Sequence, residues 1–231
     1  MTTVSHAEEV LCMTLTSDSR NLITGSKDSS LKMWELLAEN RTAKLVQILA
    51  GHADHVTAVA SAFQQTPSTL SNSSGCLSSV PSSPSPIPIA PKQLVVVSGS
   101  RDGQLIVWDA QHGSEIHSIK LHRSAVTAIR LSADGSVFVS GCKDGIVHVC
   151  SVKSGTSLSS LSLASAIRQI VIAPDVAKVW VRLDQLSHPA VLDLRHTPAV
   201  LVKPEPTPAS RPASPGNLTP FFLNNKIKAN P

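Results

Sequence analysis

The chain has 231 residues, of which 42% are hydrophobic and 16% are charged, so it can bury the core of one large domain or two small ones. Its net charge of +4 resides in residues 195–231, and the balanced charge of the remainder argues against a nucleic-acid-binding domain. The four cysteines lack the spacing of zinc ligands and are expected to be reduced thiols. No apolar stretch approaches the ~20 residues of a membrane span, and the first ten residues lack the pattern of a signal peptide.

In chain order, the segment LITGSKDSSLKMWEL (22–36) is the first of three copies of one pattern. The pattern recurs as VVVSGSRDGQLIVWDA (95–110) and VFVSGCKDGIVHVCSV (137–152). The aspartates of the second and third copies, Asp102 and Asp144, are 42 residues apart, and a period of ~40–45 residues is typical of a β-propeller blade. The first and second copies are further apart, which indicates an insertion of 28 residues in the middle repeat.

Short runs within each repeat predict β-strands separated by tight turns. The runs VTAVASAF (56–63) and VTAIRLS (126–132) are apolar and rich in β-branched residues, which favour strands. The run KDG (143–145) predicts a tight turn, because Asp and Gly tolerate left-handed backbone conformations. The run SEIHSIKL (114–121) alternates polar and apolar residues, as expected of an outer strand. Each repeat is therefore expected to form one four-stranded blade.

The middle repeat contains Gly51–His52 and Trp108–Asp109, and together with the Ser-Gly-Ser-Arg-Asp-Gly run (98–103) these pairs resemble the WD-repeat family. The resemblance implies an all-β fold, an incomplete WD-repeat β-propeller of about four four-stranded blades with a disordered C-terminal tail. It also implies a hydrogen-bonded structural tetrad of His, Ser or Thr, Asp and Trp in each blade, which rigidifies the turn when every polar atom has a partner. The residues carried over are His6, Thr24, Asp28 and Trp34; His52, Ser98, Asp102 and Trp108; and His122, Ser140 and Asp144, with Cys150 at the Trp position.

The resemblance covers residues 4–203 and divides them into four blades. The boundaries expected are 4–50 for blade one, 51–121 for blade two, 122–163 for blade three and 164–203 for a degenerate blade four. Blade four has strand-like runs, with AVLVK (199–203) as its outermost strand, but it lacks the Gly-His pair and a Trp in its third strand. The insertion at 64–92 and the tail at 204–231 are predicted to be disordered, because runs rich in Ser and Pro bury too little apolar surface to offset the entropy of ordering.

The insertion and the end of the chain carry candidate regulatory residues. Five Ser or Thr residues that precede Pro are candidate phosphorylation sites, although Ser/Pro-rich composition alone produces such dipeptides: Ser83, Ser85, Thr207, Ser214 and Thr219. Lys203 lies in a four-residue match to a SUMO acceptor pattern, for which chance is the stronger explanation. Phe221, Phe222 and Leu223 form an apolar cluster that is a candidate docking motif or a clamp on the propeller itself.

No sequence pattern of a phosphate-binding loop, a nucleophile elbow or a metal site accompanies the repeats. We therefore expect a non-enzymatic protein–protein interaction scaffold without cofactor or metal, whose partners are other proteins rather than nucleic acid or membrane. It is expected to be the C-terminal part or a short isoform of a larger WD-repeat protein, in the cytoplasm, with the nucleus as the alternative.

An alternative function is the substrate-receptor subunit of a ubiquitin ligase complex. Members of that kind often carry Trp-Asp-x-Arg after a blade, but here the run is Trp108-Asp109-Ala110-Gln111, which weakens this reading. Four blades shaped for a ring of about seven would not close, so the outward sides of blade one and blade four are both expected to expose apolar surface, with a cap formed by the degenerate blade four as the weaker alternative. That surface predicts self-association or pairing with further WD repeats.

Overall fold

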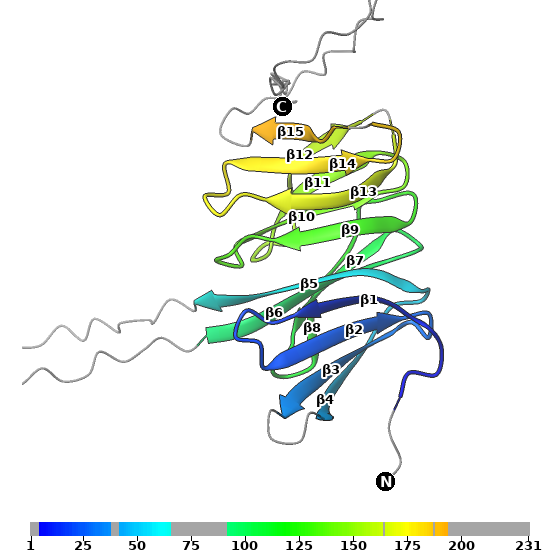
Figure 1. Ribbon diagram of the computed structural model, residues 1–231, viewed down its shortest axis with the longest axis vertical. Coiled ribbons are helices and arrows are strands. Elements are labelled where there is room, and N and C mark those ends of the chain that lie inside the picture. The colour runs from blue at the N-terminus through cyan, green and yellow to red at the C-terminus, as the bar shows by residue number, and fades with distance from the viewer. Residues whose placement is uncertain (1–4, 38–41, 66–91, 164, 187, 194–231) are drawn as a thin grey trace, which may run out of the picture.

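The computed structural model describes residues 5–37, 42–65, 92–163, 165–186 and 188–193, which form fifteen strands in four antiparallel sheets (Figure 1). We number the sheets as blades one to four. Blade one contains β1 (Val10–Leu15), β2 (Asn21–Ser26), β3 (Ser30–Leu37) and β4 (Thr42–Ala50). Blade two contains β5 (Val56–Gln65), β6 (Lys92–Ser100), β7 (Gln104–Asp109) and β8 (Ser114–Lys120). Blade three contains β9 (Val126–Leu131), β10 (Val137–Cys142), β11 (Ile146–Ser151) and β12 (Ser157–Ser162). Blade four contains β13 (Ile167–Ile172), β14 (Lys178–Leu183) and β15 (Ala190–Asp193).

Within each blade, strands that follow one another in sequence are hydrogen bonded side by side. The residue types explain the order of burial. The apolar strand β7 is buried along nearly its whole length, whereas the mixed strand β8 leaves most of its residues exposed at the outside of the blade. Within the described ranges, no helix is long and apolar enough to cross a membrane.

The first strands of the blades, β1, β5, β9 and β13, pack against one another in this order, so blades one and four lie at opposite ends of the array (Figure 1). The hydrophobic core consists of three layers, each between consecutive blades. Members from the two sides of each layer include Leu31 and Val59 in the first, Val97 and Ile129 in the second, and Val147 and Ile170 in the third. Each blade is therefore held mainly by apolar burial against its neighbours.

The prediction of disorder over residues 64–92 was wrong at both ends. Gln64 and Gln65 belong to β5 and pair with Gln93 and Lys92 of β6. These polar residues continue the ladder because antiparallel pairing satisfies their backbone groups whatever side chains they carry. Residues 66–91 lie outside the described part of the chain.

Three strands of blade four lie within the described residues, and the last of them, β15, ends at Asp193. The predicted outermost strand at 199–203 and the predicted disordered tail at 204–231 both lie outside the described residues.

Candidate functional site

Blade one brings its four predicted tetrad residues into one hydrogen-bonded chain. His6 precedes β1, Thr24 lies in β2, Asp28 in the following turn and Trp34 in β3. Trp34 Nε1 donates to Thr24 Oγ1 at 2.9 Å, and the same oxygen is 2.8 Å from His6 Nε2. His6 Nδ1 donates to Asp28 Oδ2 at 2.9 Å, because a carboxylate can only accept. The network fastens the segment before β1 to the turn between β2 and β3.

Asp28 supplies the carboxylate of this network, and several groups donate hydrogen bonds to it. Burial by itself would raise the pKa of Asp28. Hydrogen bonds from the Ser30 hydroxyl, from His6 and from the backbone N–H groups of Ser30 and Ala7 outweigh burial and hold the pKa well below its usual range. Asp28 therefore remains a carboxylate that organises the turn.

Blade two forms three quarters of the predicted tetrad. Trp108 Nε1 donates to Ser98 Oγ at 2.8 Å, and His52 Nε2 lies 2.7 Å from the same oxygen. His52 Nδ1 has no hydrogen-bond partner within the described ranges, so the expected contact with Asp102 is not formed. Asp102 Oδ1 instead accepts the backbone N–H of Gln104 at 2.8 Å. Burial lowers the pKa of His52 to about 4, and the nearby charge of Asp102 opposes this only in part.

Blade three retains only the His–Ser contact, with His122 Nε2 2.8 Å from Ser140 Oγ. His122 Nδ1 has no partner among the residues described, and the backbone N–H of Asp144 is bonded to Ser124. The ring of His148 packs edge-on against His122 at a centroid distance of 4.9 Å. Burial, with a smaller contribution from His148, lowers the pKa of His122 to about 4.

Cys150 takes the position of the missing Trp in blade three. Its thiol is buried, and burial raises its pKa to about 12, so it is a poor nucleophile at neutral pH. It pairs across the strands with Phe138, as Trp108 pairs with Val96. The small side chain at this position fills the core without replacing the indole donor.

The His–Ser pairs have the spacing of a nucleophile and its general base, but their surroundings prevent that chemistry. Ser98 and Ser140 are completely buried, and no reacting group of a substrate could reach their hydroxyls. The Ser98 oxygen is also engaged by the Trp108 indole. These networks can position turns and strands but cannot present a nucleophile.

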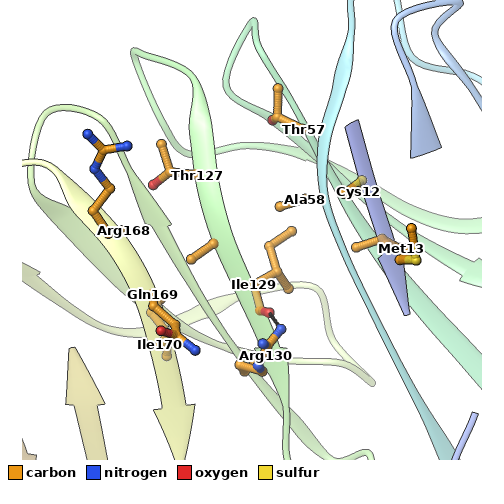
Figure 2. Close-up of a pocket in the computed structure, with 12 residues that line it drawn as sticks. Cys12, Met13, Thr57, Ala58, Thr127, Ile129, Arg130, Arg168, Gln169 and Ile170 are labelled. Atoms are coloured by element: carbon orange, nitrogen blue, oxygen red, sulfur yellow. Dashed lines mark hydrogen bonds between the residues drawn. The ribbon is translucent and has the colours of Figure 1, made fainter. Parts of the chain in front are cut away.

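A surface that can receive a ligand lies elsewhere, in a groove of about 190 Å³ formed by the first strands of all four blades (Figure 2). Figure 2 shows Met13 of β1 at one side and Gln169 of β13 at the other. The groove is lined by Cys12, Met13, Thr57, Ala58, Val59, Thr127, Ala128, Ile129, Arg130, Arg168, Gln169 and Ile170. Each of the four strands is hydrogen bonded along one edge only within its sheet.

Two arginines give the groove positive charge. Arg130 and Arg168 are exposed, and both line the groove. Arg168 Nε donates to Asp184 Oδ1 at 2.8 Å, whereas within the described ranges the guanidinium of Arg130 donates from Nη1 to the backbone carbonyl of Ile129 at 3.0 Å and to no side chain. The Arg130 guanidinium therefore keeps most of its five donors available for a ligand.

Sequence analysis did not find the groove. Its two arginines come from different repeats, and neither belongs to a recognisable motif. Superimposing the first strands of the repeats would have shown the signal, since Arg168 aligns with Thr57 and Thr127, and Arg130 aligns with Ala60.

The remaining candidate residues lie outside the described part of the chain. They are Ser83, Ser85, Lys203, Thr207, Ser214, Thr219, Phe221, Phe222 and Leu223. Where the structure describes the chain, no group of three or more His, Cys, Asp or Glu residues is arranged to hold a metal ion. Cys12, Cys142 and Cys150 are free thiols.

Comparison with known families agrees with the blade architecture. The family described as "WD domain, G-beta repeat" matches residues 1–35, 43–109 and 113–151, which is more than half of the sequence. The chain therefore belongs to the WD-repeat family.

Several curated proteins are similar to the chain. Autophagy-related protein 16 of Arabidopsis thaliana is 28% identical over 185 residues, covering 72% of this chain and 36% of that protein. Eukaryotic translation initiation factor 3 subunit I of Bombyx mori is 25% identical over 194 residues, covering 73% of this chain and 58% of that protein. Small ribosomal subunit protein RACK1y of Oryza sativa subsp. japonica is 30% identical over 106 residues, covering 42% of this chain and 31% of that protein. The chain thus spans about a third to somewhat over half of these relatives.

Proposed function

We propose that the chain is a non-enzymatic scaffold that binds other proteins, and that the groove between its first strands receives an extended peptide segment with acidic side chains. The observation that carries the proposal is the exposed pair Arg130 and Arg168 in a groove shared by four blades. A cavity of about 190 Å³ has room for a few side chains but not for a folded domain.

The composition of the groove supports this partner class. Met13, which is 67% exposed, gives the groove an accessible apolar side chain, while Arg130 can form bidentate hydrogen bonds with a carboxylate. Arg168 is already paired with Asp184, so a neutral ligand would leave the charge of Arg130 without a counter-charge. A segment that combines apolar and acidic residues matches both parts of the surface.

The names of relatives point the same way. One relative is a subunit of a translation initiation factor and another is a small ribosomal subunit protein, so both are components of assemblies. Component proteins of this kind bind through surfaces, which is consistent with buried His–Ser pairs that no substrate can reach.

Site-specific photo-crosslinking in cells tests the proposal. A diazirine residue at Thr127 in the groove is expected to form covalent adducts with other proteins, whereas one at exposed Ser160 in outer strand β12 is not. Arg130→Glu should reduce the adducts from Thr127 at least about tenfold by reversing charge in the groove. The matched variant Lys120→Glu, on exposed strand β8, should leave them unchanged.

Equal adduct formation from Thr127 and Ser160 would contradict a role for the groove. Loss of adducts in Lys120→Glu as well as Arg130→Glu would show that overall charge, rather than this site, controls binding. Melting curves of each variant establish that the fold is intact.

A further inference from the structure

The residue that follows the second strand of each blade has a different charge in blade four. It is Asp184 there, whereas in the three earlier blades it is basic: Lys27, Arg101 and Lys143. Its backbone has the same place in every blade, because its N–H donates to the carbonyl of the residue before the first strand, in blade four from Asp184 to Ala166 at 2.9 Å. Any residue type can form this backbone bond. The carboxylate of blade four is therefore not required by the turn itself.

A second position of blade four departs from the repeat in a complementary way. The residue at the bulge of the first strand is Arg168 in blade four, and in the three earlier blades it is uncharged: Leu11, Thr57 and Thr127. Arg168 Nε donates to Asp184 Oδ1 at 2.8 Å. A lysine or arginine at the position of Asp184 would repel the guanidinium instead. The two departures thus form an ion pair for which the earlier blades lack both residues.

This ion pair engages one of the two cations of the groove. Arg168 and Arg130 both line the groove, and Figure 2 shows Arg168 beside Thr127 at one end and Arg130 toward the other end. The carboxylate of Asp184 is bound to Arg168 as the carboxylate of a ligand would be bound. An acidic ligand that reaches both arginines must therefore replace Asp184.

The pair is exposed enough for such a replacement. The side chains of Arg168 and Asp184 are 64% and 44% exposed, and ion pairs in contact with water contribute little to stability. The hydrogen bond and charge of Arg168, with a smaller contribution from the charge of Arg182, hold the pKa of Asp184 below its ordinary value. Arg182 is exposed on the same strand, two residues before Asp184. A displaced Asp184 therefore retains a positive charge nearby.

The positions of the two arginines along their strands indicate the spacing of the ligand carboxylates. Arg130 of β9 has the ladder position that Val171 has in β13, three residues after Arg168. Because Arg168 is the extra residue of a bulge, the offset is between two and three ladder steps, which is about 8 Å. Alternate side chains of an extended segment lie on one face about 7 Å apart. Two acidic residues separated by one other residue match this offset.

We propose that Asp184 is an internal competitor for the groove: the ligand carries two acidic side chains at alternate positions, the first binds Arg130, and the second displaces Asp184 from Arg168. This inference rests on the proposed function, since it requires that the groove bind an extended acidic segment. Asp184 therefore weakens the binding of a doubly acidic segment. A segment with one acidic side chain binds Arg130 and leaves the ion pair intact.

Fluorescence anisotropy of the full chain with two labelled probe peptides tests the inference. Both peptides are extended and rich in serine; one contains Glu-Val-Glu, and the other contains Glu-Val-Gln in its place. We expect Asp184→Asn to raise the affinity for the doubly acidic probe at least about fivefold and that for the singly acidic probe at most about twofold. The matched variant Glu115→Gln, which removes the same charge from exposed strand β8, should change neither affinity.

A double-mutant cycle separates the ion pair from a general effect of charge. In a chain that carries Arg168→Gln, the two probes should bind equally, and the further substitution Asp184→Asn should not alter either affinity. Both residues are exposed, so cooperative melting of every variant is expected.

Two results would overturn this inference and leave the proposed function standing. Both probes could bind and lose affinity in Arg130→Glu while Asp184→Asn has no effect, which would show that Asp184 does not compete. Asp184→Asn could also strengthen binding equally with and without Arg168, which would show that its charge acts through space. Failure of both probes to bind the wild-type chain and the Asp184→Asn variant would contradict the acidic ligand of the proposed function itself.

Discussion

Hydrogen bonding to the turn aspartates differs between blades, although the sequence pattern around them is nearly the same. Asp28 accepts bonds from His6, Ser30 and Ala7, whereas the bond formed by the Asp102 side chain joins it to the Gln104 backbone. The difference arises in part from the neighbour two residues on. Ser30 contributes a hydroxyl, while Gln104 directs its amide to Ser118. An aspartate at the same turn position therefore accepts different hydrogen bonds, and contributes differently to stability, in different repeats.

Replacing each of the two aspartates by alanine should show how much each contributes to stability. We expect Asp28→Ala to lower the free energy of unfolding by about 3 kcal/mol, because it leaves His6 and several N–H groups without an acceptor. Asp102→Ala should lower it by only about 1 kcal/mol. Urea denaturation of the two variants measures both values. Equal losses would contradict the hydrogen-bonding difference between the blades.

The buried histidines predict that the fold loses stability at pH values above those at which carboxylates titrate. His52 and His122 have pKa values lowered by burial to about 4, against 6.5 for an unburied histidine. The unfolded chain therefore binds more protons between pH 6.5 and pH 4, and stability should fall as the pH is lowered through this window, by at most about 3 kcal/mol per histidine. Denaturant midpoints at several pH values measure the slope. His52→Gln should flatten it by about half, and a slope unchanged by this substitution would contradict the assignment.

At the scale of the elements, the hairpin turns differ in how well the residue type suits the backbone conformation. Gly103 follows the turn aspartate of blade two with a φ of 86°, and its missing Cβ leaves space for the backbone oxygen of His122, 2.3 Å from where a Cβ would stand. Ser29 occupies the corresponding position of blade one with a φ of 64°. A serine in this left-handed conformation is strained, whereas glycine is not.

Exchanging these residue types should have opposite effects. Ser29→Gly is expected to raise the free energy of unfolding by up to about 1 kcal/mol by relieving strain. Gly103→Ala should lower it by about 2 kcal/mol or more, because the added Cβ meets the backbone of the next blade. Thermal melting of both variants provides the comparison. Destabilisation by Ser29→Gly would show that the serine side chain contributes more than its backbone strain removes.

Much of the fold could be predicted because each repeat contains its own local signals. The run at 56–63 lies within β5 and the run at 126–132 covers β9, and the turn residues between strands marked the hairpins. The extension of β5 and β6 to Gln65 and Lys92 could not be predicted, since backbone pairing carries no side-chain signal. The groove was also missed, because Arg130 and Arg168 come to line one groove only when whole blades stack. Which residues of different blades come together depends on how the blades pack and not on local secondary-structure propensity.

At the scale of the whole molecule, stability resides in the layers between blades. Each of the three hydrophobic clusters joins two consecutive blades, and the two ends of the array have different chemistry. At one end blade one exposes Val10, Met13 and Leu15, whereas at the other end blade four exposes Arg182 and Gln169 beside Val171. The central claim is that the four described blades form an open array whose first strand leaves apolar side chains exposed.

Sedimentation velocity of the purified wild-type chain at micromolar concentration, read together with its thermal melting, tests that claim most directly. The exposed side chains of Val10, Met13 and Leu15 predict association that increases with concentration. A variant with Met13→Lys and Leu15→Glu should remain monomeric under the same conditions. A wild-type chain that sediments as a compact monomer and melts cooperatively would contradict the claim, because it would show that the four blades close or cap themselves unaided.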